Sequence, residues 1–187
     1  MKHEGIELEK RAAYAIAELM VLAAKTAPKG CGLDNVAAIV IDGGEKDALS
    51  AEMREMAKIT GAEFFERDAI NVESSHLVVM VGVKNNPVGL ANCSLCGFQD
   101  CAEMNKAGGR CALNVTDLGI AVGSAVSVAA DHRIDNRIMF SAGKAAINLK
   151  FFPEDIKICY GIPLSSSSKS IFFDRGIVGV LAKQNAE

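Results

Sequence analysis

The chain has 187 residues, of which half are hydrophobic, and it carries a net charge of −3. A chain of this length and apolar content can bury a full core, which argues against intrinsic disorder. The small negative charge provides no basic surface for nucleic acid or for an anionic membrane. The N-terminal sequence MKHEGIELEK has no signal-peptide pattern, so a cytoplasmic protein without a membrane partner is expected.

The spacing of apolar residues predicts alternating helices and strands in the first half of the chain. Helices are expected over 6–27 and 45–60, and buried strands over 36–41 and 77–83. The stretch 62–75 between them shows no clear period. Asn85, Asn86 and Pro87 then break the second strand, and a polar loop follows.

The second half continues with a helix rich in small residues, capped by Thr116 or Asp117 and running to about residue 132. Its most apolar stretch, 118–130, is shorter than the roughly 20 residues that span a bilayer. A helix over 135–149, a strand over 156–162 and a possible fourth strand over 177–182 follow. Because no linker interrupts this series, it predicts one α+β domain over 1–187, in which helices cover a central sheet of four to five strands.

Four of the six cysteines lie in the polar loop, in the spacing C-x2-C-x4-C-x9-C. Successive thiolates in so short a segment can converge on one metal centre. In a reducing compartment they are expected to be thiols or metal ligands and not disulfides. The predicted ligands, within a loop at 88–112, are Cys93, Cys96, Cys101 and Cys111.

Iron–sulfur chemistry suits this spacing better than zinc, because zinc ribbons usually present two C-x2-C pairs and this loop has one. Gly97 would let the loop turn toward the sulfur atoms, and the charges of Asp100 and Arg110 would influence the potential of a cluster. Two alternatives stay open: a structural zinc module without catalytic activity, and a cluster-based redox sensor. Cys159 is expected to fill the core, and Cys31 to be an ordinary loop residue.

Several segments together resemble a prokaryotic family of unknown function that is described as containing a ferredoxin domain, on a nitroreductase-like fold. The segments are LAAKTAPKGCGLD, NCSLCGFQDC, DLGIAVGSAVSVAA, RIMFSAGKAA and PEDIKICYGIPLSSSSKS. The resemblance covers nearly the whole chain. It implies a nitroreductase-like sandwich with the cysteine loop inserted before the central helix of small residues. It also implies a four-iron cluster held by the four loop cysteines. From such a cluster we expect a protein that transfers single electrons and that could be an oxidoreductase with a cleft beside the cluster.

The wider nitroreductase superfamily binds FMN through an arginine–serine segment ahead of the first helix, which this chain lacks. A flavin phosphate would depend instead on Lys29, Lys169 and Arg175, so weak flavin binding at most is expected. The resemblance further implies a homodimer, since Ala13, Ala17, Met20 and Ala24 widen the apolar stripe of the first helix beyond one core seam. A redox partner protein or a small electron carrier would complete the system.

Overall fold

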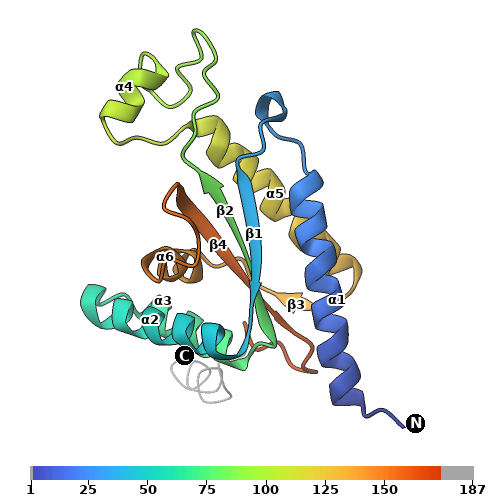
Figure 1. Ribbon diagram of the computed structural model, residues 1–187. Helices are drawn as coiled ribbons and strands as arrows, with labels where there is room; N and C mark the ends of the chain where they lie inside the picture. Colours follow the sequence, from blue (N-terminus) through green and yellow to red (C-terminus); the bar gives the residue numbers. More distant parts are fainter. Residues whose placement is uncertain (1, 174–187) are drawn as a thin grey trace, which may run out of the picture.

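The computed structural model describes residues 2–173, in which a four-stranded antiparallel sheet lies between two layers of helices (Figure 1). The strands stand in the order β1-β2-β4-β3. They are β1 (Val36–Ile41), β2 (Leu77–Lys84), β3 (Asp135–Asn136) and β4 (Ile156–Ser165). The helices are α1 (Gly5–Thr26), α2 (Gly43–Thr60), α3 (Glu63–Ser74), α4 (Cys101–Lys106), α5 (Ala112–Asp131) and α6 (Phe140–Asn148), with the short 3₁₀ helix η1 (Gly30–Gly32).

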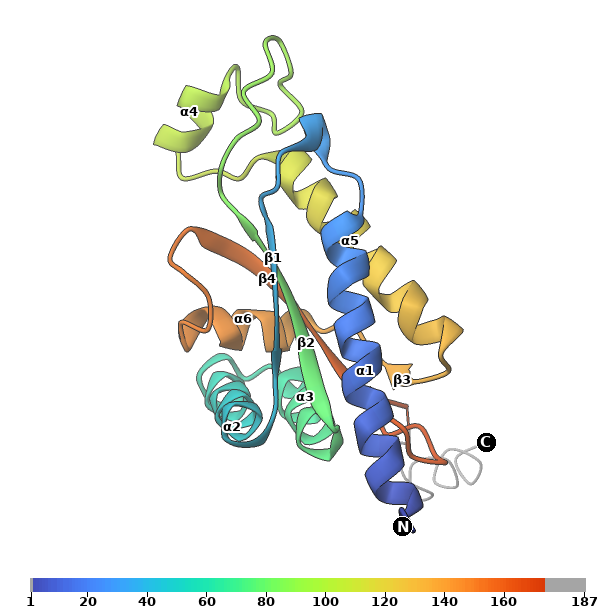
Figure 2. The ribbon, with the colours of Figure 1, turned by 45° about the vertical axis from the view of Figure 1, so that its right-hand side comes forward.

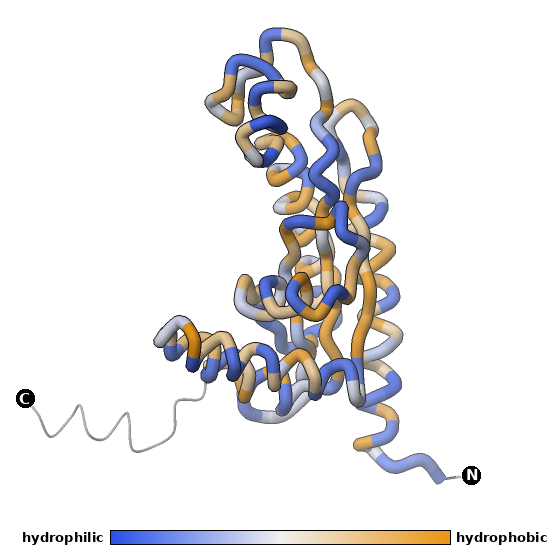
Figure 3. The backbone as a smooth tube through the Cα atoms, turned by 60° about the vertical axis from the view of Figure 1, so that its left-hand side comes forward, coloured by the Kyte–Doolittle hydropathy of each residue, from blue (hydrophilic) through white to orange (hydrophobic). Residues whose placement is uncertain are grey.

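β2 is buried along nearly its whole length because helices cover both faces of the sheet. Alternate residues from Leu77 to Val83 pack in a core with α1 and α5, and Val78 and Met80 pack in a second core with α2, α3 and α6. This division follows from the two-residue period of a strand. Figure 2 shows the two helical layers, and the strands between them are coloured mainly hydrophobic in Figure 3. The predicted α+β sandwich is therefore confirmed.

Most predicted elements are present, with ends shifted by one or two residues. The strand predicted over 36–41 has those bounds, and α1 and α2 match the first two predicted helices. The unassigned stretch 62–75 forms α3, where Phe65, Ala69 and Val72 are buried at helical spacing. The predicted strand at 177–182 lies outside the described residues.

Two predicted helices begin elsewhere in the structure. α5 starts at Ala112, about a turn before the cap expected at Thr116 or Asp117, and its N-cap is Cys111. Asp117 lies inside the helix and is buried. The predicted helix over 135–149 was wrong at its start. Asp135 and Asn136 pair with β4 as β3, and α6 begins only at Phe140. The cysteine loop also contains a helix, α4, that the sequence reading did not predict.

α1 and α5 pack side by side on one face of the sheet and leave apolar residues exposed on their outer side (Figure 1). The four residues expected to widen the stripe of α1 in fact face the core, whereas Leu8, Leu19 and Leu22 are exposed. On α5, Val115 and Ile120 are exposed.

α5 is also longer than the apolar stretch identified in the sequence. With 20 residues and a mean hydropathy of 1.4, it could cross a membrane by length and composition alone, which also holds for core helices of soluble proteins. Its buried side packs against α1 and the sheet.

Three asparagines join the base of the cysteine loop to the sheet and to α5. The buried Asn114 amide donates to the carbonyl oxygens of Lys84 (3.1 Å) and Asn86 (2.6 Å). The Asn35 amide donates to the same Asn86 carbonyl (3.2 Å) and to Asn114 Oδ1 (3.5 Å), and the Asn86 amide returns a bond to Asn35 Oδ1 (3.1 Å). These bonds satisfy backbone oxygens where the chain leaves β2, and so fix the direction in which the loop begins.

Replacing Asn114 by Ala should destabilise this junction. The substitution removes two hydrogen bonds to partly buried carbonyl oxygens and leaves the Lys84 carbonyl without its Asn114 donor, which costs about 1–3 kcal/mol of unfolding free energy. Chemical denaturation would measure the loss, and limited proteolysis should cut the cysteine loop faster. Thr116→Ala, on the exposed side of the same helix, should leave both unchanged. Equal stability of Asn114→Ala and the parent would contradict this role.

The exposed apolar side of α1 and α5 leads us to expect a homodimer through this surface. Light scattering should give about twice the chain mass of 19.7 kDa. Leu22→Glu should produce monomers, because it places a charge at an exposed apolar position of this surface. Ile59→Glu, at an exposed position on α2 across the sheet, should leave the dimer intact. A parent protein that is monomeric at micromolar concentration would refute the expectation.

Candidate metal centre

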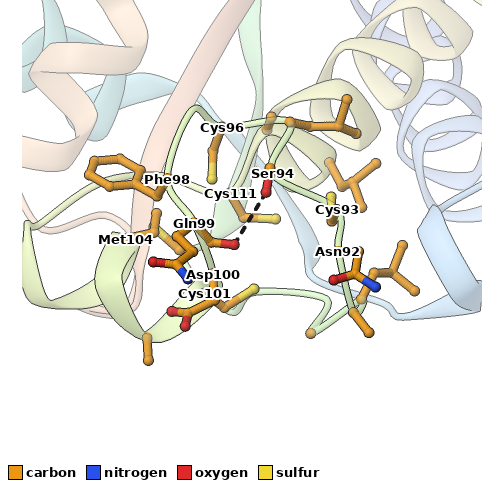
Figure 4. A pocket seen from close by; sticks show the side chains of 17 residues that line it. Asn92, Cys93, Ser94, Cys96, Phe98, Gln99, Asp100, Cys101, Met104 and Cys111 are labelled. Carbon is orange, nitrogen blue, oxygen red and sulfur yellow. Dashed lines mark hydrogen bonds between the residues drawn. The ribbon is translucent and has the colours of Figure 1, made fainter.

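All four cysteines of the loop line one cavity of about 290 Å³ at the end of the sheet from which β2 exits. The cavity lies between the loop that follows β2, α4 and the start of α5. In Figure 4 the sulfur atoms of Cys93, Cys96, Cys101 and Cys111 are arranged around one common space. Apolar side chains make up most of the remaining wall: Leu90, Leu95, Phe98, Met104 and Leu113.

Different elements position the four thiols. Cys93 and Cys96 belong to the irregular loop, Cys101 is the first residue of α4, and Cys111 is the N-cap of α5. Cys111 is buried, and the other three are partly exposed. Four cysteines that lie close together in the sequence are therefore positioned by three elements: the loop after β2, the start of α4 and the start of α5.

A reciprocal cap fixes the start of α4, which carries Cys101. Asp100 Oδ1 accepts the backbone N–H of Glu103 (2.8 Å), and Glu103 Oε2 accepts the backbone N–H of Gln99 (2.8 Å). Two otherwise unpaired donors at a helix start are satisfied in this way. The Asp100 carboxylate therefore has a structural role in addition to the electrostatic role predicted for it.

The segment from Cys93 to Gln99 is held by tight turns. Ser94 and Gly97 both have positive φ, of 46° and 84°. The Gly97 N–H donates to the Ser94 carbonyl (3.0 Å), and the Ser94 hydroxyl donates to the Gln99 carbonyl (3.2 Å). Glycine adopts such a φ without steric cost, so Gly97 closes the turn after Cys96, with its N–H directed to the Ser94 carbonyl.

Gly109 lets the chain return closely past α4 before Cys111. A Cβ atom at this position would lie 2.9 Å from both Phe98 Cε2 and Met104 Cγ. The Gly109 N–H also donates to the Met104 carbonyl (2.8 Å). A side chain at residue 109 would therefore push on the cavity wall.

The start of α5 favours negative charge at the cavity. The partial positive charge at the N-terminus of a helix stabilises anions, and Cys111 lies at this point of a 20-residue helix. The neighbouring Arg110 guanidinium is fixed by bonds from Nη1 to the carbonyls of Gly108 and Gly109, both 2.8 Å. Anionic thiolate ligands are thus compatible with this environment.

The thiols surround a volume and do not meet at a point. Among the described residues, no three His, Cys, Asp or Glu side chains are grouped closely enough to hold a single metal ion. Four sulfurs at about 2.3 Å from one zinc ion would lie within about 4 Å of one another. In a four-iron cluster each cysteine binds a separate iron, so the sulfurs spread further apart. Four soft sulfur donors around one cavity fit an iron–sulfur cluster.

Of the residues expected near a flavin phosphate, Lys29 and Lys169 do not line this cavity. The Lys29 ammonium donates to the carbonyls of Ala24, Lys25 and Ala27 at 3.1, 2.7 and 2.8 Å, and so caps the end of α1. A phosphate would have to displace these bonds, since an ammonium has three donors. Burial, and then the charge of Lys25, lower the pKa of Lys29, while Asp117 opposes the shift. Lys169 follows the serine run after β4, and Arg175 lies outside the described residues.

The two remaining cysteines lie outside the cavity. Cys159 is buried in β4, and burial raises the pKa of its thiol to about 12, so it remains a neutral core residue. Cys31 is exposed in η1 with a positive φ of 55°.

The sequence reading missed Asn35, Asn114 and Asp117, which are all buried near the base of the loop. The sequence predicted Asp117 only as a helix cap. For Asn114 and Asp117, the signal in the sequence was a polar residue on the buried side of a largely apolar helix. Polar residues are normally exposed unless they form hydrogen bonds.

Solved structures support the fold. A putative NADH dehydrogenase/NAD(P)H nitroreductase from Bacteroides thetaiotaomicron is 14% identical, with a TM-score of 0.56, over 83% of this chain and 74% of its own. A nitroreductase with bound FMN from Desulfitobacterium hafniense is also 14% identical, with a TM-score of 0.58, over 83% and 78% of the two chains. At these identities the likeness shows a nitroreductase-like fold alone.

The sequence comparisons identify the family. Residues 107–175 match the family model described as "Uncharacterized protein containing a ferredoxin domain". A protein from Archaeoglobus fulgidus, itself described as uncharacterized, is 40% identical over 182 residues, which cover 93% of this chain and 94% of the relative. The resemblance seen in the sequence is confirmed, and the chain belongs to this family of proteins with a ferredoxin domain on a nitroreductase-like fold.

Proposed function

We propose that the protein binds one four-iron cluster through Cys93, Cys96, Cys101 and Cys111 and transfers single electrons. The observation that carries the proposal is the cavity of about 290 Å³ that all four cysteines line. When bound, such a cluster supplies reversible one-electron oxidation and reduction. The description of the family as containing a ferredoxin domain supports the same chemistry, although its model matches a segment that includes only Cys111 of the four.

The residues of the cavity have separate tasks in this function. The cysteines supply the ligands, and the apolar side chains of Phe98, Met104 and Leu113 limit the access of water. Low solvent exposure protects a cluster and influences its potential. The asparagine junction and the cap of α4 hold the loop in position, so that the ligands need little rearrangement to bind.

Electrons would enter and leave at the outer wall of the cavity. Leu90 and Leu95 line the cavity and are also exposed, at 47% and 66%. The hollow on the inner side, beside Cys111 and Arg110, has only about 10 Å³, which suits about one water molecule and no organic substrate. We therefore propose exchange with a redox partner protein or a small electron carrier at the outer wall. Weak flavin binding stays a prediction separate from this proposal.

Purification without oxygen, followed by metal analysis and spectroscopy, tests the proposal. The protein should be brown and should contain iron and acid-labile sulfide in equal amounts. Reduction by dithionite should bleach the visible absorption reversibly. A colourless protein with one zinc ion would instead identify the structural zinc module. A cluster that oxidants break down, so that dithionite no longer restores the parent spectrum, would favour the redox sensor.

Each single Cys→Ala change among the four ligands should remove the cluster or convert it. Loss of one iron would lower the iron content by roughly a quarter, and loss of the cluster would lower it to near zero. Cys31→Ser is the matched control, because Cys31 is a cysteine of the same chain that lies outside the cavity; it should retain the full iron content. The ligand assignment fails if Cys111→Ala keeps the iron, the sulfide and the spectrum of the parent.

A further inference from the structure

Asp117 carries a buried carboxylate, and neither the fold nor the proposed ligand set explains its second oxygen, Oδ2. It lies in the second turn of α5 and is only 4% exposed. Oδ1 accepts the backbone N–H of Gly30 at 2.9 Å. Oδ2 is buried and has no hydrogen-bond partner among the described residues. Burying an incompletely bonded carboxylate is unfavourable, so its retention suggests a role for the charge.

The carboxylate lies behind the wall of the cysteine cavity. Asp117 follows Cys111 by six residues on one helix, which corresponds to about 9 Å along the axis. Gly30, its hydrogen-bond partner, packs toward Val88, whose Cγ2 would be 3.9 Å from a Cβ at residue 30. The next residue, Gly89, lines the cavity. Figure 2 shows η1 beside the start of α5 and the cysteine loop.

No direct ion pair neutralises this carboxylate among the described residues. Lys29 is the neighbouring cation, and its ammonium is held by three carbonyls at the end of α1. Asp117 itself is only 4% exposed, so its carboxylate lies away from bulk water. In such surroundings charges act over longer distances than at the surface, and dissolved salt screens them less.

We propose that the carboxylate of Asp117 lowers the reduction potential of the group held by the four cysteines. The inference rests on the proposed function. In the reduction, the group gains one electron and the reductant loses one. Nearby negative charge makes the gain of an electron less favourable. Asp117 would thus favour the oxidised form and make the reduced form a stronger electron donor.

The test is a redox titration of the cluster-loaded protein with dithionite. Asp117→Asn keeps an Oδ1 acceptor for Gly30, removes the charge and replaces Oδ2 by an amide NH2 group of similar size, so the midpoint potential should become more positive. Asp131→Asn removes the same charge from the exposed last residue of the same helix and should leave the potential unchanged. The difference should persist at high salt. Iron content and thermal unfolding would verify that the cluster and the fold are retained.

A second variant covers the case in which Asp117→Asn fails to fold or to hold the cluster. Lys29→Gln removes the neighbouring positive charge and should shift the potential in the opposite direction, by a smaller amount because Lys29 is partly exposed. An unchanged potential in Asp117→Asn with a full cluster, or shifts of the same sign in both variants, would overturn the inference and leave the proposed function intact. A parent protein without a cluster would overturn both.

Discussion

Where β2 leaves the sheet, the side-chain amides of Asn35 and Asn114 donate to partly buried backbone carbonyls, and the Asn86 amide donates to Asn35 Oδ1. Everything beyond this junction depends on it, because the cysteine loop begins at Asn85 and returns at Cys111, three residues before Asn114. An unpaired buried carbonyl costs as much as a lost hydrogen bond, so the junction has few alternative arrangements. A loop with left-handed turns and a six-residue helix can therefore be held in one place.

The layered core gives this junction a rigid base. β2 contributes alternate side chains to two separate hydrophobic cores, and α5 packs with α1 over one of them. Since α5 closes a core and has Cys111 as its N-cap, a ligand of the proposed cluster is attached directly to a core helix. The buried carboxylate of Asp117 lies on the same helix, which links the charge near the cavity to the packing of α5.

Fold and proposed chemistry come from different parts of the chain. The nitroreductase-like sandwich is shared with flavin-binding proteins, whereas the cysteine cavity is formed by a segment between β2 and α5. Lys29, which was expected near a flavin phosphate, caps α1 instead. The likeness of fold alone therefore does not assign a flavin, and the donor set of the cavity gives the stronger indication of function.

The sequence by itself determined the strong periodic elements, the sandwich class and the cysteine spacing, because these depend on local patterns of apolar and sulfur-containing residues. It did not determine that Ala13 and Met20, and not Leu8 and Leu19, face the core, since both sets lie on apolar sides of α1. Nor did it place Asp117 inside the protein or join three distant asparagines at one junction. Those features arise only when α5 packs against the sheet, because a buried polar group finds its partners across tertiary contacts and not along the chain.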